Sequence, residues 1–374
     1  MKKRLGDYIQ EYSVRNKSGE DIPVYSITNS QGFCRDYFSK EVASKDKTSY
    51  KIVPRGCFAY NPSRINVGSV DWQRDEERVI VSPLYNVFSV SPEIDQQYLY
   101  YYLKSSATSY RIKEVATGSV RDNLRLSMLY DFMIELPSLD VQRQIVSNLD
   151  LLASIIRQRN QQLTKLDELI KARFVEMFGD PIQNEKCWEI KSLFDLGYCK
   201  NGMNFHKGDH GVEIHCLGVG DFKDRSTIYD VKNLPYVALN ESPDSDYLLQ
   251  DGDIVFVRSN GNKELVGRCL AIYPENVPVT YSGFCIRYRL TSEKASVPYI
   301  LRVLKADSVR KKMAGRGANI QNLNQQTLSQ LAIPLPPLSL QNQFAAFVAE
   351  VDKSKLFAEL FAQSTCILAE NRSK

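Results

Sequence analysis

The sequence has few of the residues on which enzyme active sites most often depend. Only three histidines occur in 374 residues, His206, His210 and His215, so the first half of the chain has none. They lie close to Cys216, but carboxylate or thiolate ligands at metal-binding spacings are missing. We therefore expect no metal site, and we expect solvated loop histidines.

Cofactor and catalytic motifs are also missing. No Gly-x-x-x-x-Gly-Lys loop occurs, and "LGVGD" (217–221) lacks the third glycine of a dinucleotide-binding loop. The segment "NPSR" (61–64) partly matches the Asn-Pro-Pro-aromatic signature of amino-methyltransferases, but it lacks the second proline and the aromatic residue. No Ser/His/Asp constellation stands out. The sequence predicts a binding protein with no catalytic residues and no cofactor of its own.

No hydrophobic run approaches the roughly 18 residues of a membrane span. The start, "MKKRLGDYIQ", has no apolar stretch after its basic residues, which argues against a signal peptide. The eight cysteines form no CxxC pair, so most are expected to be small buried residues in a reducing compartment. A cytoplasmic protein without membrane contact is the expectation.

The charge balance is only mildly basic. The 48 lysines and arginines exceed the 44 acidic residues by four, and hydrophobic residues make up 43% of the chain. This composition is typical of a well-cored globular protein. It permits a nucleic-acid partner without requiring one, because the distribution of the charge decides.

What the sequence does have is an internal repeat. The stretch "ELPSLDVQRQI" (135–145) returns 199 positions later as "PLPPLSLQNQF" (334–344). The same offset matches several residues upstream, and with two gaps "VPRGCFAYNPSRINVGSV" (53–70) matches "LQDGDIVFVRSNGNKELVGRC" (249–269). Both segments predict a glycine turn, an alternating strand, a polar loop and a return strand. The length suits two domains, so the chain is expected to contain two similar domains, each followed by a helix.

Each repeat ends in a helical pattern. Prolines end an extended segment at Pro137 and Pro336, and Ser138 is a candidate N-cap. The helix over 139–178 would span roughly 60 Å, and Gly179 and Pro181 would stop it. Apolar residues at heptad spacing predict that the two helices pack as an antiparallel pair; they are Ile145, Leu149, Leu152, Ile156, Leu163, Leu166, Ile170, Phe344, Val348 and Val351. A core-facing helix is the simpler alternative.

The predicted domain boundaries follow from this pattern. The first domain is expected at 1–137, its helix at 138–179, the second domain at 180–336 and the second helix at 337–374. The fold class is expected to be α+β (mixed α/β), with an internal pseudo-two-fold repeat.

The polar loops indicate the ligand. Arginine can recognise guanine, and asparagine or glutamine can recognise adenine, by paired hydrogen bonds, while basic side chains also hold phosphates. The candidates in the first copy are Arg55, Tyr60, Asn61, Arg64, Asn66, Arg121, Asn123 and Arg125. Those in the second copy are Arg258, Ser259, Asn260, Asn262, Lys263, Arg316, Asn319, Gln321, Asn322 and Asn324. The alternative is that these polar loops are simply solvated. Similar side chains at matching positions in both copies make this alternative less favoured.

Three segments carry a resemblance to a known family. They are "ATGSVRDNLRLSMLYDFMIELPSLDVQRQI", its second copy "GRGANIQNLNQQTLSQLAIPLPPLSLQNQF", and "ARFVEMFGDPIQNEKCWEIKSL". Over essentially its full length the chain resembles a specificity (S) subunit of a type I restriction–modification system. The family usually has Glu before the Gln of the repeat, whereas this chain has Val141 and Leu340.

The resemblance implies a division of labour. Each domain would be a target recognition domain for one half of a bipartite double-stranded DNA target. The family's two conserved helices would form an antiparallel coiled coil that spaces the domains and docks two modification (methyltransferase) subunits. Those subunits would hold S-adenosylmethionine, and restriction subunits would add ATP-driven translocation and cleavage.

Other interpretations remain open at this point. A specificity subunit of a related restriction class would share this layout. A DNA adenine methyltransferase with its own recognition domain is disfavoured by the missing motifs, and a scaffold that only pairs proteins is a weaker rival.

Overall fold

The computed structural model describes residues 2–35, 46–116, 123–205, 208–222, 225–314 and 322–372. Four of the predicted DNA-binding residues, Arg121, Arg316, Asn319 and Gln321, lie outside these ranges, as does His206. The chain divides into unit 1, residues 1–157 with 368–374, and unit 2, residues 158–367. Among the described residues, no helix is long and apolar enough to cross a membrane.

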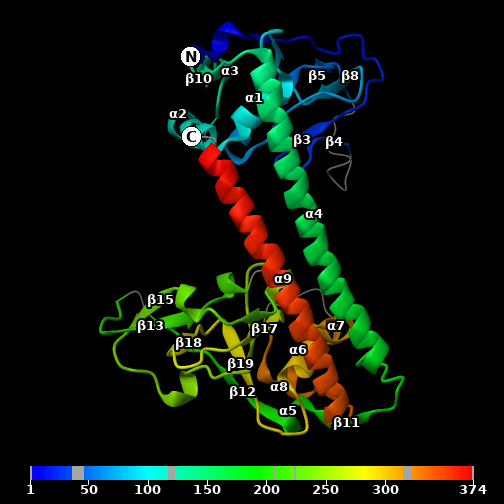
Figure 1. Cartoon of the computed structure of the whole chain (residues 1–374), viewed down its shortest axis with the longest axis vertical. Coiled ribbons are helices and arrows are strands. Elements are labelled where there is room, and N and C mark those ends of the chain that lie inside the picture. The colour runs from blue at the N-terminus through cyan, green and yellow to red at the C-terminus, as the bar shows by residue number, and fades with distance from the viewer. Residues whose placement is uncertain are drawn as a thin grey trace. The chain divides into compact units, whose positions relative to one another are not determined.

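Unit 1 contains a four-stranded sheet and three strand pairs, among them β5 with β8, which is labelled in Figure 1. The sheet has the order β2-β9-β6-β7, and the pairs are β1-β10, β3-β4 and β5-β8. The strands are β1 (Lys2–Arg4), β2 (Ile9–Glu11), β3 (Ser26–Thr28), β4 (Gly32–Cys34), β5 (Lys51–Pro54), β6 (Phe58–Tyr60), β7 (Val70–Trp72), β8 (Arg78–Val81), β9 (Asn86–Val90) and β10 (Met133–Glu135). The helices are α1 (Gln96–Lys104), α2 (Ser106–Val115), α3 (Leu126–Leu129) and α4 (Leu139–Phe178), the last of which ends in unit 2.

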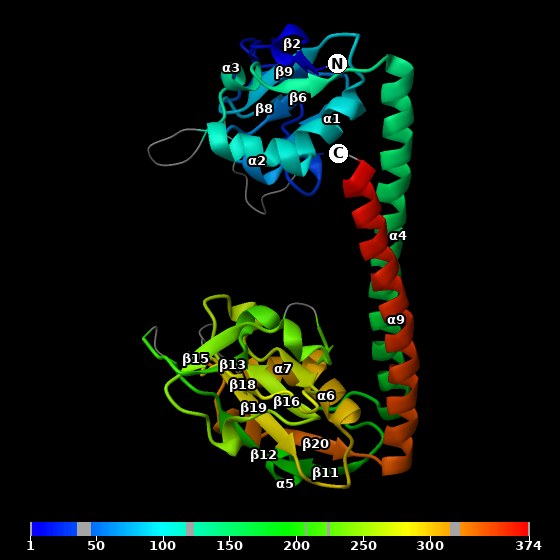
Figure 2. The same ribbon diagram turned by 60° about the vertical axis from the view of Figure 1, so that its left-hand side comes forward.

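Unit 2 contains a five-stranded sheet of the order β12-β19-β16-β17-β14, whose strands β12, β19 and β16 can be followed in Figure 2. A second sheet has the order β15-β13-β18, and β11 pairs with β20. The strands are β11 (Glu189–Ser192), β12 (Gly197–Asn201), β13 (Val212–Leu217), β14 (Thr227–Ile228), β15 (Tyr236–Leu239), β16 (Asp253–Val257), β17 (Cys269–Ile272), β18 (Val279–Tyr281), β19 (Cys285–Leu290) and β20 (Ala332–Leu335). The helices are α5 (Leu193–Leu196), α6 (Val297–Lys305), α7 (Asp307–Ala314), α8 (Gln325–Ser329) and α9 (Leu338–Arg372).

The two units repeat one topology, as the sequence predicted. Strands β2, β9, β6 and β7 of unit 1 correspond to β12, β19, β16 and β17 of unit 2, in the same order. Helices α1, α2 and α3 likewise correspond to α6, α7 and α8 in chain order. The fold is therefore mixed α/β with an internal repeat.

The strand register shows which residues occupy equivalent places. One row across the sheet of unit 1 runs Glu11, Phe88, Phe58 and Trp72. The corresponding row of unit 2 runs Cys199, Tyr288, Ile254 and Ala271. The two rows can be aligned on a shared backbone contact, because the carbonyls of Pro62 and Arg258 each accept a hydrogen bond from an equivalent leucine amide. Phe58 lies four residues before Pro62, and Ile254 lies four residues before Arg258. Trp72 of unit 1 is thus matched by Ala271 of unit 2.

Both faces of each central sheet are buried, whereas the sequence pattern predicted alternation between apolar and polar residues. In unit 1, Phe58 and Tyr60 pack with the helices on one face, while Ala59 packs with β5 and β8 on the other. In unit 2, Ile254 and Val255 divide between two clusters in the same way. Strands covered on both sides read as continuous apolar runs.

The repeated glutamines explain why the two helix entrances have the same sequence. The Gln142 side chain donates to the carbonyls of Glu93 (3.0 Å) and Pro137 (2.9 Å), and its Oε1 accepts from the Asp95 amide (2.9 Å).

Gln341 makes the same three contacts in unit 2. It donates to the carbonyls of Lys294 (3.0 Å) and Pro336 (2.8 Å) and accepts from the Ser296 amide (2.9 Å). Both glutamines are fully buried. Each fixes the first turn of a long helix to the loop that begins α1 or α6.

A pair of tyrosines adds a second equivalent contact. The Tyr98 hydroxyl donates to the Glu135 carbonyl (2.8 Å), and the Tyr299 hydroxyl donates to the Pro334 carbonyl (2.7 Å). These bonds hold α1 to β10 and α6 to β20, next to the prolines that precede the long helices.

Helix α4 begins at Leu139 and ends at Phe178, as the sequence predicted. Within unit 2, α4 and α9 run in opposite directions, because Phe344 contacts Phe174 and Phe178 while Lys355, further along α9, pairs with Asp167 (2.6 Å). Of the residues predicted to line this seam, Ile170, Phe344 and Val351 are core residues, and Leu166 and Val348 pack against them. The others, Ile145, Leu149, Leu152, Ile156 and Leu163, are half-buried.

Candidate nucleic-acid interface

The structure joins the two groups of predicted DNA-binding residues within unit 1. The loop after β6 (residues 61–69) lies against the segment that begins at Asn123. The Leu124 amide donates to the Pro62 carbonyl (3.1 Å), and the buried Tyr60 hydroxyl donates to the Leu124 carbonyl (3.0 Å). Asn86 donates to the same hydroxyl (2.9 Å). Sequence positions about 60 residues apart therefore form one surface.

Unit 2 makes the same junction. The Leu323 amide donates to the Arg258 carbonyl (2.7 Å), and Ser259 forms a β-bridge with Asn322. The Arg258 guanidinium donates to the Gly283 carbonyl (3.4 Å). The loop after β16 (residues 258–268) is thus tied to the segment before α8.

The candidates differ in exposure. Exposed side chains can contact DNA directly, and these are Arg64, Asn123, Arg125, Asn262, Asn322 and Asn324. Half-buried candidates are Asn61, Asn66, Arg258, Ser259 and Asn260. Lys263 lies in the loop after β16, in the turn Lys263–Leu265. Tyr60 is fully buried, so its hydroxyl holds the two segments together instead of facing a ligand.

The asparagines shape the loops that present them. Asn61 Oδ1 accepts from the Ser63 amide (3.1 Å), and Asn260 Oδ1 accepts from the Asn262 amide (2.8 Å). Asn324 caps α8 by accepting from the Thr327 amide (2.8 Å). Such Asx turns use the side-chain oxygen and leave the side-chain amide as a donor for acceptors on a base or phosphate.

Arg55 lies at the opposite end of β6 from this surface. Its guanidinium donates to the carbonyl of Asp75 (2.6 Å) in the loop between β7 and β8. Of the predicted residues of unit 1 that the structure describes, Arg55 is the one that the fold separates from the rest.

Sequence reasoning missed one residue that supports the surface. Arg310, on α7, donates to the Glu264 carbonyl (3.1 Å) and braces the loop after β16. In unit 1, α2 lies beside the turn Ile65–Val67 of the corresponding loop. The basic sequence "VRKKM" gave no indication that one of these side chains would hold a loop.

The chemistry that the described residues offer is hydrogen bonding and positive charge. His215, predicted to be a solvated loop residue, is buried, with its ring 4.0 Å from that of Tyr236 and Nδ1 2.9 Å from the Leu234 carbonyl. Burial raises the pKa of the Cys216 and Cys285 thiols to about 12, so they are protonated and poor nucleophiles. Guanidinium and carboxamide groups on loops suit recognition of DNA.

Comparison with known proteins identifies the family. A family model described as "Type I restriction modification DNA specificity domain" matches residues 6–165 and again residues 186–360. The chain belongs to this family. The two matches coincide with the two repeats of the fold.

Curated specificity subunits are similar to this member of the family. The StySPI specificity subunit from Salmonella potsdam is 24% identical over 276 residues, which cover 69% of this chain and 58% of that protein. The EcoKI specificity subunit from Escherichia coli is 22% identical over 272 residues, or 68% of this chain and 58% of that protein. The chain therefore spans less than two thirds of the length of these two relatives.

A solved structure supports the fold assignment. The type I restriction–modification S subunit from M. genitalium matches with a TM-score of 0.53 and 13% identity, over 99% of this chain and 94% of that chain. A second structure, described as concerning complex assembly of the type I restriction–modification system, has the same TM-score at 15% identity. At these identities the likeness concerns the fold.

Proposed function

We propose that this chain is the DNA sequence-specificity subunit of a type I restriction–modification complex. Each domain recognises one half of a bipartite double-stranded target. The chain supplies recognition and no catalysis. The proposed domains are residues 1–137 and 180–336, each followed by a spacer helix, residues 138–179 and 337–374.

The observation that carries this proposal is the repeated junction between loop and segment. The contacts Leu124–Pro62 and Leu323–Arg258 join equivalent backbone atoms in the two units. Around them, however, unit 1 presents Pro62, Ser63 and Arg64 where unit 2 presents Arg258, Ser259 and Asn260. One frame with two different sets of hydrogen-bonding side chains suits two different half-sites.

We propose that the long helices form an antiparallel coiled coil that sets the distance between the half-sites. The contacts of Phe344 with Phe174 and of Lys355 with Asp167 support opposite directions within unit 2. A packed helix pair is stiff, so helix length would determine the number of base pairs between the two half-sites.

The partners follow from the same proposal. Two modification subunits would dock on the helices and carry S-adenosylmethionine, and restriction subunits would carry the ATP-driven activities. The arrangement requires no cofactor on this chain.

Methylation mapping tests the proposal. The methylated bases of cells that carry the modification partner are sequenced with and without this chain. A bipartite motif that is methylated only when the chain is present supports the proposal. Methyl transfer by the purified chain with S-adenosylmethionine would contradict the proposal. Methylation of the same motif in cells that lack this chain would also contradict it.

A further inference from the structure

A cavity of about 110 Å³ lies within unit 2, where α6 and β17 meet the two long helices. Its walls come from strands β14 and β17 and from helices α4, α6 and α9. They include Ala271, Tyr273, Leu301, Arg302 and Lys305, together with residues of α4 and α9. The surface used for the proposed DNA recognition does not contribute these residues.

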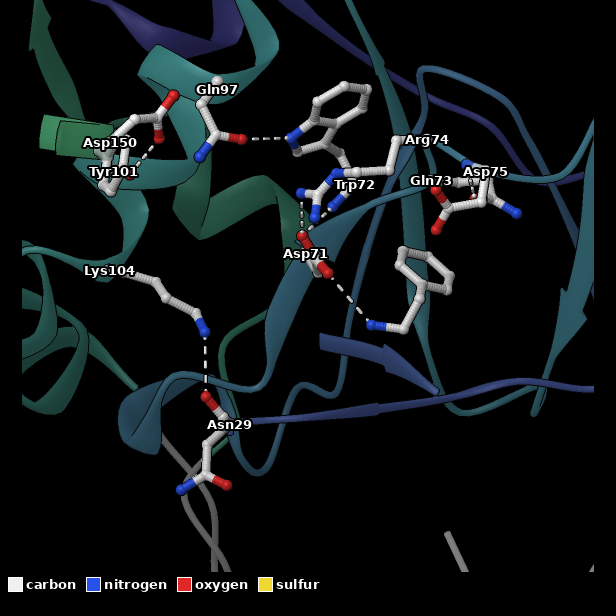
Figure 3. A network of polar contacts seen from close by, with 11 residues as sticks. Asn29, Asp71, Trp72, Gln73, Arg74, Asp75, Gln97, Tyr101, Lys104 and Asp150 are labelled. Atoms are coloured by element: carbon white, nitrogen blue, oxygen red, sulfur yellow. Dashed lines mark hydrogen bonds and ion pairs between the residues drawn. The ribbon is translucent and has the colours of Figure 1, made fainter. Parts of the chain in front are cut away.

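In unit 1, the side chains of Trp72, Arg74 and Gln97 lie together at the corresponding place (Figure 3). Trp72 stands where unit 2 has Ala271, and its indole N–H donates to Gln97 Oε1 (3.1 Å). The Arg74 guanidinium lies over the Trp72 ring, 4.6 Å from its centroid, and bonds Asp71 (2.8 Å). Tyr100 lies beside Arg74, 5.8 Å from guanidinium carbon to ring centroid.

The helices confirm that the two places are equivalent. Helices α1 and α6 both have nine residues, and each lies against its strand, β7 or β17. Lys104 and Lys305 are the last residues of these helices. Lys104 donates to the Asn29 carbonyl (3.0 Å), and Lys305 donates to Ser226 Oγ (2.6 Å). By the same count, Tyr100 corresponds to Leu301 and Tyr101 to Arg302.

The cavity thus lies where unit 2 has smaller side chains than unit 1. Ala271 and Leu301 stand in unit 2 where unit 1 has Trp72 and Tyr100. The space left is similar to that of an engineered cavity of about 150 Å³ that binds one benzene molecule. It therefore suits a ligand with a single aromatic ring. The rings of Tyr229 and Tyr273, stacked 5.1 Å apart, form an aromatic part of the wall.

The charges of the wall favour an anion beside that ring. Among the described residues, no acceptor lies within hydrogen-bonding or ion-pair distance of the Arg302 guanidinium. Burial lowers the pKa of Arg302 and of Lys305, because both cations are partly removed from water. The carboxylates of Asp167 and Asp352, by contrast, are paired with Lys355 at 2.6 Å and 3.2 Å.

We propose that this cavity is a binding site for a small aromatic carboxylate. Its ring takes the place that the Trp72 indole has in unit 1, and its carboxylate bonds the Arg302 guanidinium. The ligand contacts β17, α6, α4 and α9 together, so it stabilises the seating of the helices on the domain.

Three probes with one carbon skeleton and different charges test the site on the full-length chain. Titration calorimetry and thermal unfolding are measured with phenylacetate, 2-phenylethanol and 2-phenylethylamine. Phenylacetate is expected to bind at roughly millimolar concentration or below, about tenfold more tightly than the alcohol, and to raise the unfolding temperature. The amine is expected to bind least.

Two variants place the binding in this cavity. Ala271→Trp restores the residue type of unit 1 and should abolish phenylacetate binding. Arg302→Met keeps an apolar stem of similar length and should remove the preference for phenylacetate over the alcohol. Lys311→Met, on the exposed face of α7, is the control and should bind as the parent does.

The proposal is overturned if phenylacetate and the amine bind equally, or if no probe binds. It is also overturned if a folded Ala271→Trp or Arg302→Met variant binds phenylacetate as tightly as the parent. The Arg302 side chain is partly exposed, so Arg302→Met is expected to fold. It therefore tests the proposal even if Ala271→Trp does not fold.

Discussion

The two units share a frame and differ in what the frame holds. The buried side chains of Gln142 and Gln341 make the same three hydrogen bonds, and Tyr98 and Tyr299 donate to equivalent carbonyls. At equivalent positions of the central sheets, however, unit 1 has Cys57 and Ser89 where unit 2 has Asp253 and Arg289. The hydrogen bonds that recur in both units end on backbone atoms, which are present whatever the side chain of that residue is. Contacts between two side chains differ between the units.

If the proposed function holds, this difference explains how one fold serves two DNA half-sites. Bonds to carbonyls and amides fix the sheet, the loop junction and the helix entrance without specifying the loop sequence. The loops are then able to differ, as "NPSRIN" and "VRSNGN" do. Each variant below tests whether a contact belongs to the shared frame or to one unit alone.

The largest effect is expected from an ion pair that unit 2 alone possesses. Arg289 bonds both oxygens of the buried Asp253 carboxylate, at 2.8 Å and 2.7 Å. Arg289→Leu leaves that charge uncompensated and should lower the free energy of unfolding by about 3–5 kcal/mol in urea titration. Asp253→Cys with Arg289→Ser installs the pair of residues found in unit 1 and should recover part of the loss. If the double variant is no more stable than Arg289→Leu, the two positions are not equivalent in the sheets of the two units.

The helix-entrance glutamines should have the next largest effect, and an equal one in both units. Gln142→Leu and Gln341→Leu each leave two carbonyls and an amide without the side-chain partner that they have in the folded chain, at a cost of about 2–4 kcal/mol. The exposed Gln144→Leu and Gln343→Leu, also 199 positions apart, are the matched controls. Urea unfolding should show loss for the first pair only. A loss confined to one unit argues against a shared frame.

Loop variants separate the two half-sites. Arg64→Ala should weaken binding to one half-site by ~1–3 kcal/mol if the arginine contacts a base, and Arg258→Ala should weaken the other. Fluorescence anisotropy with duplexes altered in one half at a time measures this. Arg55→Ala is the control in unit 1, because Arg55 lies at the other end of β6. If a variant weakens binding to all of these duplexes equally, the replaced arginine contacts phosphates and not bases.

The smallest effect is expected at the tyrosines. Tyr98→Phe and Tyr299→Phe each remove one hydrogen bond, worth about 1 kcal/mol. Tyr299 is almost fully buried and Tyr98 is not, so the Tyr299 variant should lose more, because the Pro334 carbonyl has no access to replacement water. Unfolding midpoints in urea provide the comparison.

The sequence predicted the repeat and the extent of α4, because these depend on local pattern and on similarity between two halves. It contained Gln142 and Gln341 at a fixed offset, but not their role, since their partners are backbone atoms of a distant loop. The burial of Tyr60 and the position of Arg55 depend on strand register. The cavity beside Ala271 required both units to be compared in three dimensions.

The central claim is that two similar domains recognise two half-sites at a distance set by the helices. The most direct test repeats the four residues "QQLT" after Thr164 and maps methylated sites over a library of spacings. The insertion adds about one helical turn, or roughly 6 Å, which corresponds to one or two base pairs at ~3.4 Å each. The account predicts unchanged half-sites and a gap longer by one or two base pairs. An unchanged gap in a folded insertion variant would contradict it.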